Sequence, residues 1–272
     1  MLSARLATAA VAIPFLLWLI FLAPFPVYRG VVLLFTLVAL VEYFQMAFPT
    51  RLPLQRLGIV SGALVAVGMS GPPGESAMVF AAGLMAVVTI GLMSCLLAAD
   101  DPTGAVNSLG HMVLGVLYAG AFLPHFIWLH EQPAESGAAW VTFVVAVAMG
   151  SDSGGYFAGR FFGKHLLMPS VSPKKTIEGA AGSIVGTVIA GVLVKTALLS
   201  MIGWREILVL SLVAGALAQI GDLCESLLKR AFGAKDSGWL LPGHGGVLDR
   251  ADSLVFPVVL VYYYVNFLRA DG

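Results

Sequence analysis

The sequence predicts an all-α integral membrane protein that crosses the bilayer several times. Hydrophobic residues make up 59% of its 272 residues and charged residues only 11%, whereas a soluble domain carries about 25% charged residues. The mean hydropathy is +0.92. A chain this apolar cannot hide its surface in one core, and the length of its apolar runs suits membrane-spanning helices. The net charge of zero gives no indication of nucleic-acid binding.

Polar or Pro/Gly-containing breaks separate nine apolar segments, each a candidate membrane span. They run near residues 6–23, 30–48, 57–71, 77–99, 106–129, 138–158, 179–201, 205–228 and 251–268. The third is short, and the sixth runs into polar residues. The first resembles a signal peptide, but it is as long as a span and is followed by Pro24-Phe25-Pro26 instead of a cleavage site, so we expect it to be retained.

The positions of the Lys and Arg residues predict the orientation. With nine spans, Arg29, Lys195, Arg205 and Arg269 fall on one side of the membrane and the other eleven on the opposite side. The side richer in cations is normally cytoplasmic. We therefore expect a cytoplasmic N-terminus, with the polar segments 150–178 and 229–250 facing the cytoplasm.

The chain is interpreted as one integrated membrane domain with N-terminal helices over 1–138 and a C-terminal transmembrane region over 139–272. Glu42 is the one notable acid of the first part. It lies either at the membrane interface or buried with a partner, and its neighbours Tyr43 and Gln45 favour the interface. Neither Cys95 nor Cys224 has the spacing of a metal site.

Polar residues first gather in the run SDSGGYFAGRFFGKH, residues 151–165. Helical spacing places Asp152, Tyr156 and Arg160 on one stripe with Gly155 and Gly159. Close helix packing would explain the glycines. It does not explain two ionised residues beside them, so we expect a polar cavity at the cytoplasmic end of this helix.

A second polar run, PSVSPKKTIEG, covers residues 169–179. Ser172 followed by Pro173 predicts a helix start. Lys174, Lys175 and Thr176 would then place ammonium groups, hydroxyls and free N–H groups together, which suits phosphate. A basic anchor for anionic lipid is the alternative, but it needs neither the Ser-Pro start nor Thr176.

The third polar run, residues 219–252, dominates the sequence. Steps of three and four put six polar side chains on one helical face: Gln219, Asp222, Glu225, Ser226, Lys229 and Arg230. A glycine-rich loop follows and ends on Asp249, Arg250 and Asp252. Ionised groups on the last turns of an apolar helix are costly and usually functional. Carboxylates beside phosphate-binding cations indicate magnesium-dependent phosphoryl or nucleotidyl transfer.

The segment SLLKRAFGAKDSGWLLPGHGGVLDRAD, residues 226–252, resembles the signature of the bacterial phosphatidate cytidylyltransferases, or CDP-diacylglycerol synthases. That signature is S-x-x-K-R-x4-K-D-x5-P-x-H-G-G-x-x-D-R-x-D. The runs that begin at Asp152, Ser172 and Gln219 also resemble the family. The resemblance is strong over 150–253 and weak in the N-terminal half.

This resemblance implies an enzyme that condenses CTP with phosphatidic acid to give CDP-diacylglycerol and pyrophosphate. It also implies a polytopic helical homodimer in the bacterial inner membrane, with a metal centre at the cytoplasmic interface. Asp222 and Asp249 would hold Mg²⁺, with a K⁺ ion close by.

The expected catalytic residues are Asp222, Asp249 and Lys229. The expected substrate-binding residues are Asp152, Arg160, Ser172, Lys174, Lys175, Thr176, Ser226, Arg230, Lys235, His244 and Arg250. Of these, Lys174 and Lys175 would hold the triphosphate. Lys229, Arg230 and Arg250 would neutralise the lipid phosphate or the leaving pyrophosphate, and His244 would bond a phosphate oxygen.

Three alternatives fit less well. A secondary transporter should show an internal repeat and ionisable residues near the bilayer midplane, whereas the charges here gather at one membrane face. A scaffold protein has no use for a stripe of carboxylates and lysines. A related CTP-using membrane enzyme, such as a polyprenol kinase or a transferase for another lipid phosphate, would share the chemistry and differ in its acceptor.

Overall fold

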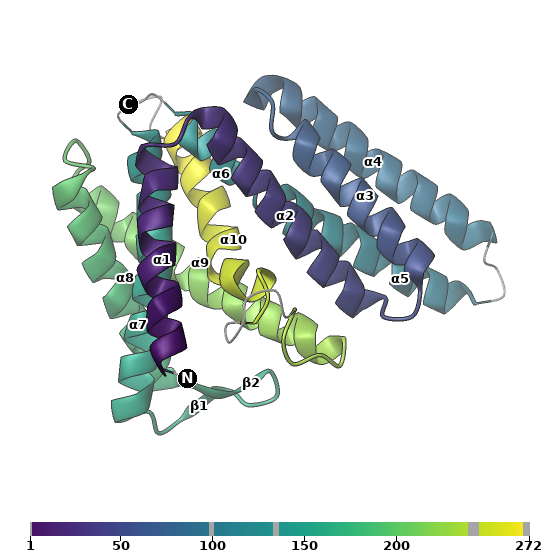
Figure 1. The fold of residues 1–272 in the computed structure, drawn as a ribbon. Helices are drawn as coiled ribbons and strands as arrows, with labels where there is room; N and C mark the ends of the chain where they lie inside the picture. Colours follow the sequence, from purple (N-terminus) through teal and green to yellow (C-terminus); the bar gives the residue numbers. More distant parts are fainter. Residues whose placement is uncertain (1, 98–100, 133–135, 239–244, 269–272) are drawn as a thin grey trace. The chain divides into compact units, whose positions relative to one another are not determined.

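The computed structural model describes residues 2–97, 101–132, 136–238 and 245–268, and they are predominantly helical (Figure 1). Two short strands are the exception to the all-α prediction. The elements are, in order, α1 (Leu2–Phe21), α2 (Phe25–Ala47), α3 (Leu52–Gly68), α4 (Pro73–Leu97), α5 (Pro102–Gly115), the π-helix η1 (Val116–Ala121), α6 (His125–His130), α7 (Gly137–Phe162), β1 (Leu166–Met168), β2 (Ser172–Thr176), α8 (Ile177–Ala197), α9 (Trp204–Ala231), α10 (Leu248–Tyr263) and the π-helix η2 (Tyr264–Leu268).

Several of these helices have the length and composition of membrane spans. Five described stretches qualify: Phe25–Ala47, Pro73–Leu96, Pro102–His130, Ile177–Ala197 and Trp204–Ala231. Two shorter apolar helices, Ala12–Phe21 and Leu52–Gly68, accompany them. The chain is therefore a helical membrane protein. Helices α7 and α10 are not among the five, and both carry charged residues of the polar runs.

The chain divides into two compact units. Unit 1 comprises Met1–Ala23, Leu129–Lys235 and Asp249–Gly272, and unit 2 comprises Pro24–Trp128 and Asp236–Leu248. In unit 2, α2 packs on α3, where Gly58 and Gly62 lie directly against the side chains of Phe44 and Leu40. Glu42 lies in the same part of α2 and is only 5% exposed. The interfacial interpretation of Glu42 is therefore wrong, because the polar partners that bury it come from a distant segment.

In unit 1, α7 and α8 run side by side with their backbones in direct contact (Figure 1). A β-carbon built on Gly150 would lie 2.6 Å from the carbonyl oxygen of Gly186. One built on Gly154 would lie 3.0 Å from the carbonyl carbon of Gly182. Small residues at four-residue spacing allow such an approach. The glycines of both helices therefore form a closely packed seam between α7 and α8. The polar side chains lie further along α7, so their positions depend on this packing.

The strands β1 and β2 form an antiparallel hairpin between α7 and α8, with Leu166 opposite Thr176 and Met168 opposite Ser172. The predicted helix start at Ser172 is therefore wrong. Helix α8 begins at Ile177, and the hydroxyl of Thr176 caps it by accepting a hydrogen bond from Gly179 N at 3.1 Å. A residue before proline favours extended backbone, so Ser172 enters the strand and the next hydroxyl along the chain becomes the cap.

The glycine seam gives a stability prediction. The Gly150→Ala substitution places a methyl group against the backbone of α8 and should destabilise the protein by about 1–3 kcal/mol, the usual cost of overpacking. The measurement is the thermal unfolding midpoint of purified protein in detergent.

Gly30→Ala is the matched control, because Gly30 is also helical and a β-carbon built on it would have no heavy atom within 4 Å. It should leave the midpoint unchanged. An unchanged midpoint for Gly150→Ala as well would contradict the close contact of α7 with α8.

Candidate active site

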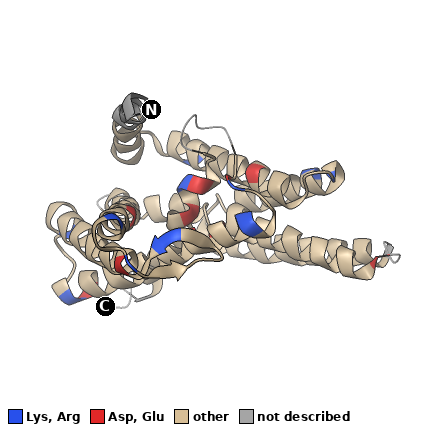
Figure 2. Ribbon diagram, turned by 90° about the horizontal axis from the view of Figure 1, so that it is seen from below, with Lys and Arg blue, Asp and Glu red and all other residues tan. Residues whose placement is uncertain are grey.

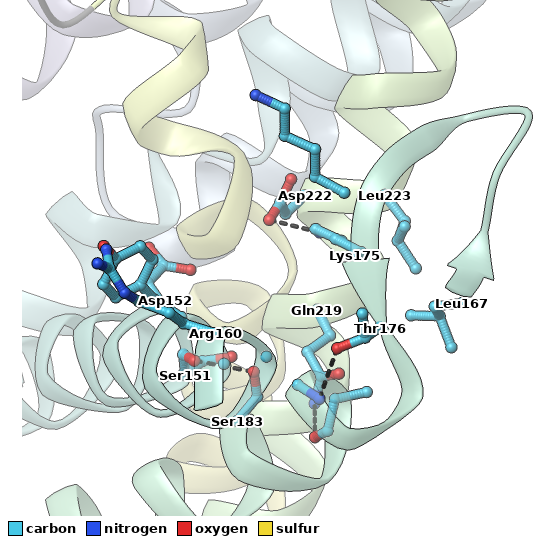
Figure 3. A pocket seen from close by; sticks show the side chains of 16 residues that line it. Ser151, Asp152, Arg160, Leu167, Lys175, Thr176, Ser183, Gln219, Asp222 and Leu223 are labelled. Carbon is cyan, nitrogen blue, oxygen red and sulfur yellow. Dashed lines mark hydrogen bonds and ion pairs between the residues drawn. The ribbon is translucent and has the colours of Figure 1, made fainter. Parts of the chain in front are cut away.

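A cavity of about 410 Å³ lies in unit 1 among α7, the β-hairpin, α8 and α9 (Figure 3). Charged residues are sparse along most of the helices (Figure 2), but this cavity has five in its lining. Its wall consists of Ser151, Asp152, Gly155, Tyr156, Gly159, Arg160, Leu167, Lys174, Lys175, Thr176, Gly179, Ala180, Ser183, Gln219, Asp222 and Leu223.

Helix α7 supplies one wall through the stripe that contains Asp152, Tyr156 and Arg160. The Arg160 guanidinium donates a hydrogen bond to the Tyr156 hydroxyl at 2.7 Å and lies 5.9 Å from the centre of its ring. The glycines on the same stripe leave room for the hydroxyls of Thr176, at the end of β2, and Ser183, in α8. A β-carbon on Gly159 would lie 3.2 Å from Thr176 Oγ1. Cations and hydroxyls thus face the cavity together.

The opposite wall holds an ion pair between β2 and α9. Lys175 Nζ lies 2.5 Å from Asp222 Oδ2, and both side chains are 28% exposed (Figure 3). One turn earlier on α9, Gln219 donates a hydrogen bond to the carbonyl oxygen of Ala180 at 3.3 Å. These contacts hold α9 against β2 and α8, and they leave the Lys175–Asp222 pair within reach of water.

Asp222 also has two acidic neighbours. Its charge repels the carboxylates of Asp152 on α7 and Asp252 on α10, while Lys175 and Arg250 attract Asp152. In the part of the chain that the structure describes, no three His, Cys, Asp or Glu side chains converge to hold one metal ion. A donor set of one or two carboxylates beside phosphate-binding cations nevertheless suits Mg²⁺, which keeps water ligands and shares substrate phosphates.

A second charged cluster joins α9 to α10 within unit 1. The ammonium of Lys229 contacts the carboxylate of Glu225 and lies 2.6 Å from Asp249 Oδ1. The side chains of Glu225, Asp249 and Lys229 are 1%, 9% and 13% exposed. Charges buried this deeply need mutual pairing. Sequence reasoning gave Glu225 no role, although its position four residues before Lys229 was the signal for a helical ion pair.

The predicted site residues therefore separate into groups. Those in the cavity wall are Asp152, Arg160, Lys174, Lys175, Thr176 and Asp222. Lys229 and Asp249 belong to the second cluster, and Asp252 interacts electrostatically with both Asp222 and Lys229, which links that cluster to the cavity. The cavity wall does not include five further described residues: Ser172, Ser226, Arg230, Lys235 and Arg250. Arg230 donates a hydrogen bond to the carbonyl oxygen of Val171 at 3.4 Å, and His244 falls outside the described residues.

Comparison with known proteins shows the family to which this sequence belongs. Residues 3–268 match the model of the cytidylyltransferase family. The chain is 36% identical over 161 residues to a phosphatidate cytidylyltransferase of Bacillus subtilis, covering 59% of this chain and 60% of that one. It is 41% identical over 179 residues to a phosphatidate cytidylyltransferase of Brucella suis, covering 66% of each.

A third relative, the uncharacterized protein YnbB of Escherichia coli, is 35% identical over 170 residues, covering 61% of this chain and 57% of that one. The matched part thus spans about three fifths to two thirds of these relatives' lengths. Because the family model extends over nearly all of the sequence, the chain belongs to the cytidylyltransferase family.

Proposed function

We propose that this protein is a phosphatidate cytidylyltransferase, which condenses CTP with phosphatidic acid to give CDP-diacylglycerol and pyrophosphate. The observation that carries the proposal is the cavity of a cytidylyltransferase-family chain whose wall contains the cations Arg160, Lys174 and Lys175 together with the carboxylate of Asp222. Two of the relatives bear the name phosphatidate cytidylyltransferase, and a cavity lined by cations is suited to substrate phosphates.

In this reaction a phosphate oxygen of the lipid attacks the α-phosphorus of CTP. The new O–P bond forms as the bond between the α-phosphorus and the bridging oxygen breaks, and pyrophosphate leaves with that electron pair. The attacking oxygen is already largely anionic at neutral pH, so a strong general base is not required. The protein must instead hold two polyanions close together and offset their repulsion.

The cationic residues have roles that follow from this need. We assign Lys174 and Lys175 to the triphosphate of CTP, with Arg160, Asp152, Ser172 and Thr176 around it. We assign Lys229, Arg230 and Arg250 to the lipid phosphate or the leaving pyrophosphate. Ser226, Lys235 and His244 complete the proposed substrate contacts.

We assign Asp222 and Asp249 to Mg²⁺, with a K⁺ ion nearby. When bound, magnesium supplies neutralisation of the negative charge on the substrate phosphates. Each proposed ligand is paired with a lysine, Asp222 with Lys175 and Asp249 with Lys229. A lysine that releases its carboxylate is available to a phosphate.

For the whole chain we propose nine membrane spans, a cytoplasmic N-terminus, the bacterial inner membrane as location and a homodimer as assembly. The proposed organisation is one integrated membrane domain with N-terminal transmembrane helices over 1–138 and a catalytic region over 139–272. The site then faces the cytoplasm, where CTP is dissolved, and the lipid enters sideways from the bilayer.

The defining experiment incubates purified protein with magnesium and CTP labelled at either the α- or the γ-phosphate, with phosphatidic acid or a polyprenol as acceptor. Transfer of the α-label to phosphatidic acid, release of pyrophosphate and loss of activity in EDTA are expected. Transfer of the γ-label to the polyprenol alone would replace this proposal with a lipid kinase.

The carboxylate assignment predicts that Asp222→Asn and Asp249→Asn each lower turnover by about 100-fold or more, the scale seen when one preorganised electrostatic contact to a transition state is lost. The change keeps the size of each side chain and removes its charge. Turnover is measured as labelled CDP-diacylglycerol formed per minute.

Glu131→Gln serves as the control, since Glu131 is an exposed carboxylate outside both clusters. It should leave turnover unchanged. An Asp249→Asn enzyme with normal turnover would remove Asp249 from the proposed metal ligands.

The lysine assignment predicts that Lys174→Ala raises KM for CTP about tenfold, because a hydrogen bond to a charged group contributes about 1.5–3 kcal/mol. The KM for phosphatidic acid should change less. Initial rates at varied CTP and fixed lipid give the first KM, and initial rates at varied lipid and fixed CTP give the second.

Lys164→Ala is the matched control, because Lys164 is an exposed lysine just before the hairpin and is absent from the cavity wall. Equal KM values for the Lys174→Ala, Lys164→Ala and unaltered proteins would favour a membrane anchor over a nucleotide contact.

The topology predicts opposite accessibility for two single cysteines in a background with Cys95→Ser and Cys224→Ser. A cysteine in place of Met201, between α8 and α9 and 87% exposed, should react with an impermeant thiol reagent from outside the cell. A cysteine in place of Ala234, after α9, should react only after the membrane is opened. The reverse pattern would overturn the proposed orientation.

A further inference from the structure

Glu42 is a buried carboxylate that the proposed mechanism does not use. It lies in α2 of unit 2, is 5% exposed, and its neighbours Leu40, Tyr43 and Phe44 are fully buried. A carboxylate in such surroundings is costly unless hydrogen-bond donors or a cation meet it. The described residues show no ion pair for Glu42, and hydrogen-bond donors meet its carboxylate instead.

The donors come from the ends of one segment about 200 residues further along the chain. Glu42 Oε1 accepts a hydrogen bond from Val247 N at 3.0 Å. Its Oε2 accepts one from Leu248 N at 2.8 Å and another from Ser237 Oγ at 3.2 Å. All three donors belong to unit 2. One side chain therefore holds both residue 237 and residues 247–248.

Two glycines of the same segment leave space for this carboxylate. A β-carbon on Gly238 would lie 2.7 Å from Cδ of Glu42, and one on Gly246 would lie 2.6 Å from Oε1. Any larger residue would have to displace the Glu42 side chain. The fit of Gly238 and Gly246 around Glu42 shows that the segment is shaped to this side chain.

The hydrogen bonds also fix where α10 begins. Leu248 is its first residue, and the first N–H groups of a helix have no acceptor within the helix. The carboxylate of Glu42 satisfies the N–H of Leu248 and suits the positive end of the helix dipole. Asp249 is the next residue and is joined to Leu248 by a peptide bond. A shift of Leu248 therefore also shifts Asp249.

We infer that Glu42 is a positioning residue that clamps Ser237, Val247 and Leu248 and thereby fixes the start of α10, the helix in which Asp249 follows Leu248, an inference that rests on the proposed function. Glu42 touches neither substrate nor reacting atoms in this role. It acts through the start of α10, and a displaced Asp249 would bind magnesium less well and support turnover less well.

The test is Glu42→Gln. The amide keeps the shape but replaces one acceptor oxygen with an NH₂ group, which faces an N–H donor in either orientation. We expect backbone amide exchange in peptides covering residues 245–252 to become about tenfold faster, measured by mass spectrometry on protein without magnesium. We also expect kcat to fall on the order of 100-fold, the cost of misplacing a reacting group by about 1 Å.

A third readout separates positioning from loss of folded protein. A smaller folded fraction lowers the rate by the same factor at every magnesium concentration. A misplaced ligand instead raises the magnesium concentration needed for half-maximal activity. We expect that concentration to rise at least threefold in Glu42→Gln. Glu75→Gln, which makes the same chemical change at an exposed site in α4, should alter none of the three measurements.

Gly246→Ala approaches the same contact from the other side and keeps the charge of Glu42. It should also speed exchange over 245–252 and raise the magnesium requirement, and it provides the test if Glu42→Gln does not fold. Gly30→Ala, in α2 with open space around it, is its control.

Two results would overturn the inference: unchanged exchange in both variants, or faster exchange with normal turnover and magnesium dependence. A wild-type protein that makes no CDP-diacylglycerol would instead remove the proposed reaction. The exchange measurement would still show whether Glu42 holds the segment.

Discussion

Ionised groups in an apolar chain must be met by charge or by hydrogen-bond donors, and the charged centres of this structure follow from that constraint. A buried charge left alone costs several kcal/mol. Asp222 meets the ammonium of Lys175, Glu225 and Asp249 share that of Lys229, and Glu42 meets N–H and hydroxyl donors. In each case a partner comes from another segment of the chain, so the charged groups are satisfied only when the chain is folded.

Glycine residues allow these close approaches between segments in both units. In unit 1 the contact of Gly150 and Gly154 with α8 brings the hydroxyls of Thr176 and Ser183 to the polar stripe of α7. In unit 2, Gly238 and Gly246 leave room for the carboxylate of Glu42. In both places the absent side chain is what allows a polar group to lie in the interior.

Sequence patterns predicted the parts of the fold and site that depend on near neighbours. The apolar runs located helices, and the stripe from Asp152 to Arg160 does line a cavity. Local rules failed at Ser172-Pro173, which predicted a helix start, because Ser172 enters a strand and Thr176 caps the helix instead. They failed also for Glu42, whose donors lie 195 to 206 residues away. The sequence pattern within α2 contains no information about these donors, because only the tertiary fold brings them to Glu42.

The balance of charge in the cavity supports its use for phosphates. Its wall contains three cations, Arg160, Lys174 and Lys175, and two carboxylates, Asp152 and Asp222. An excess of positive charge favours an anionic ligand over a cationic one. If a metal ion takes the carboxylate of Asp222, Lys175 loses its partner and the attraction for phosphate increases. The Lys175–Asp222 pair thus couples the proposed binding of magnesium to the proposed binding of the nucleotide, because each event favours the other.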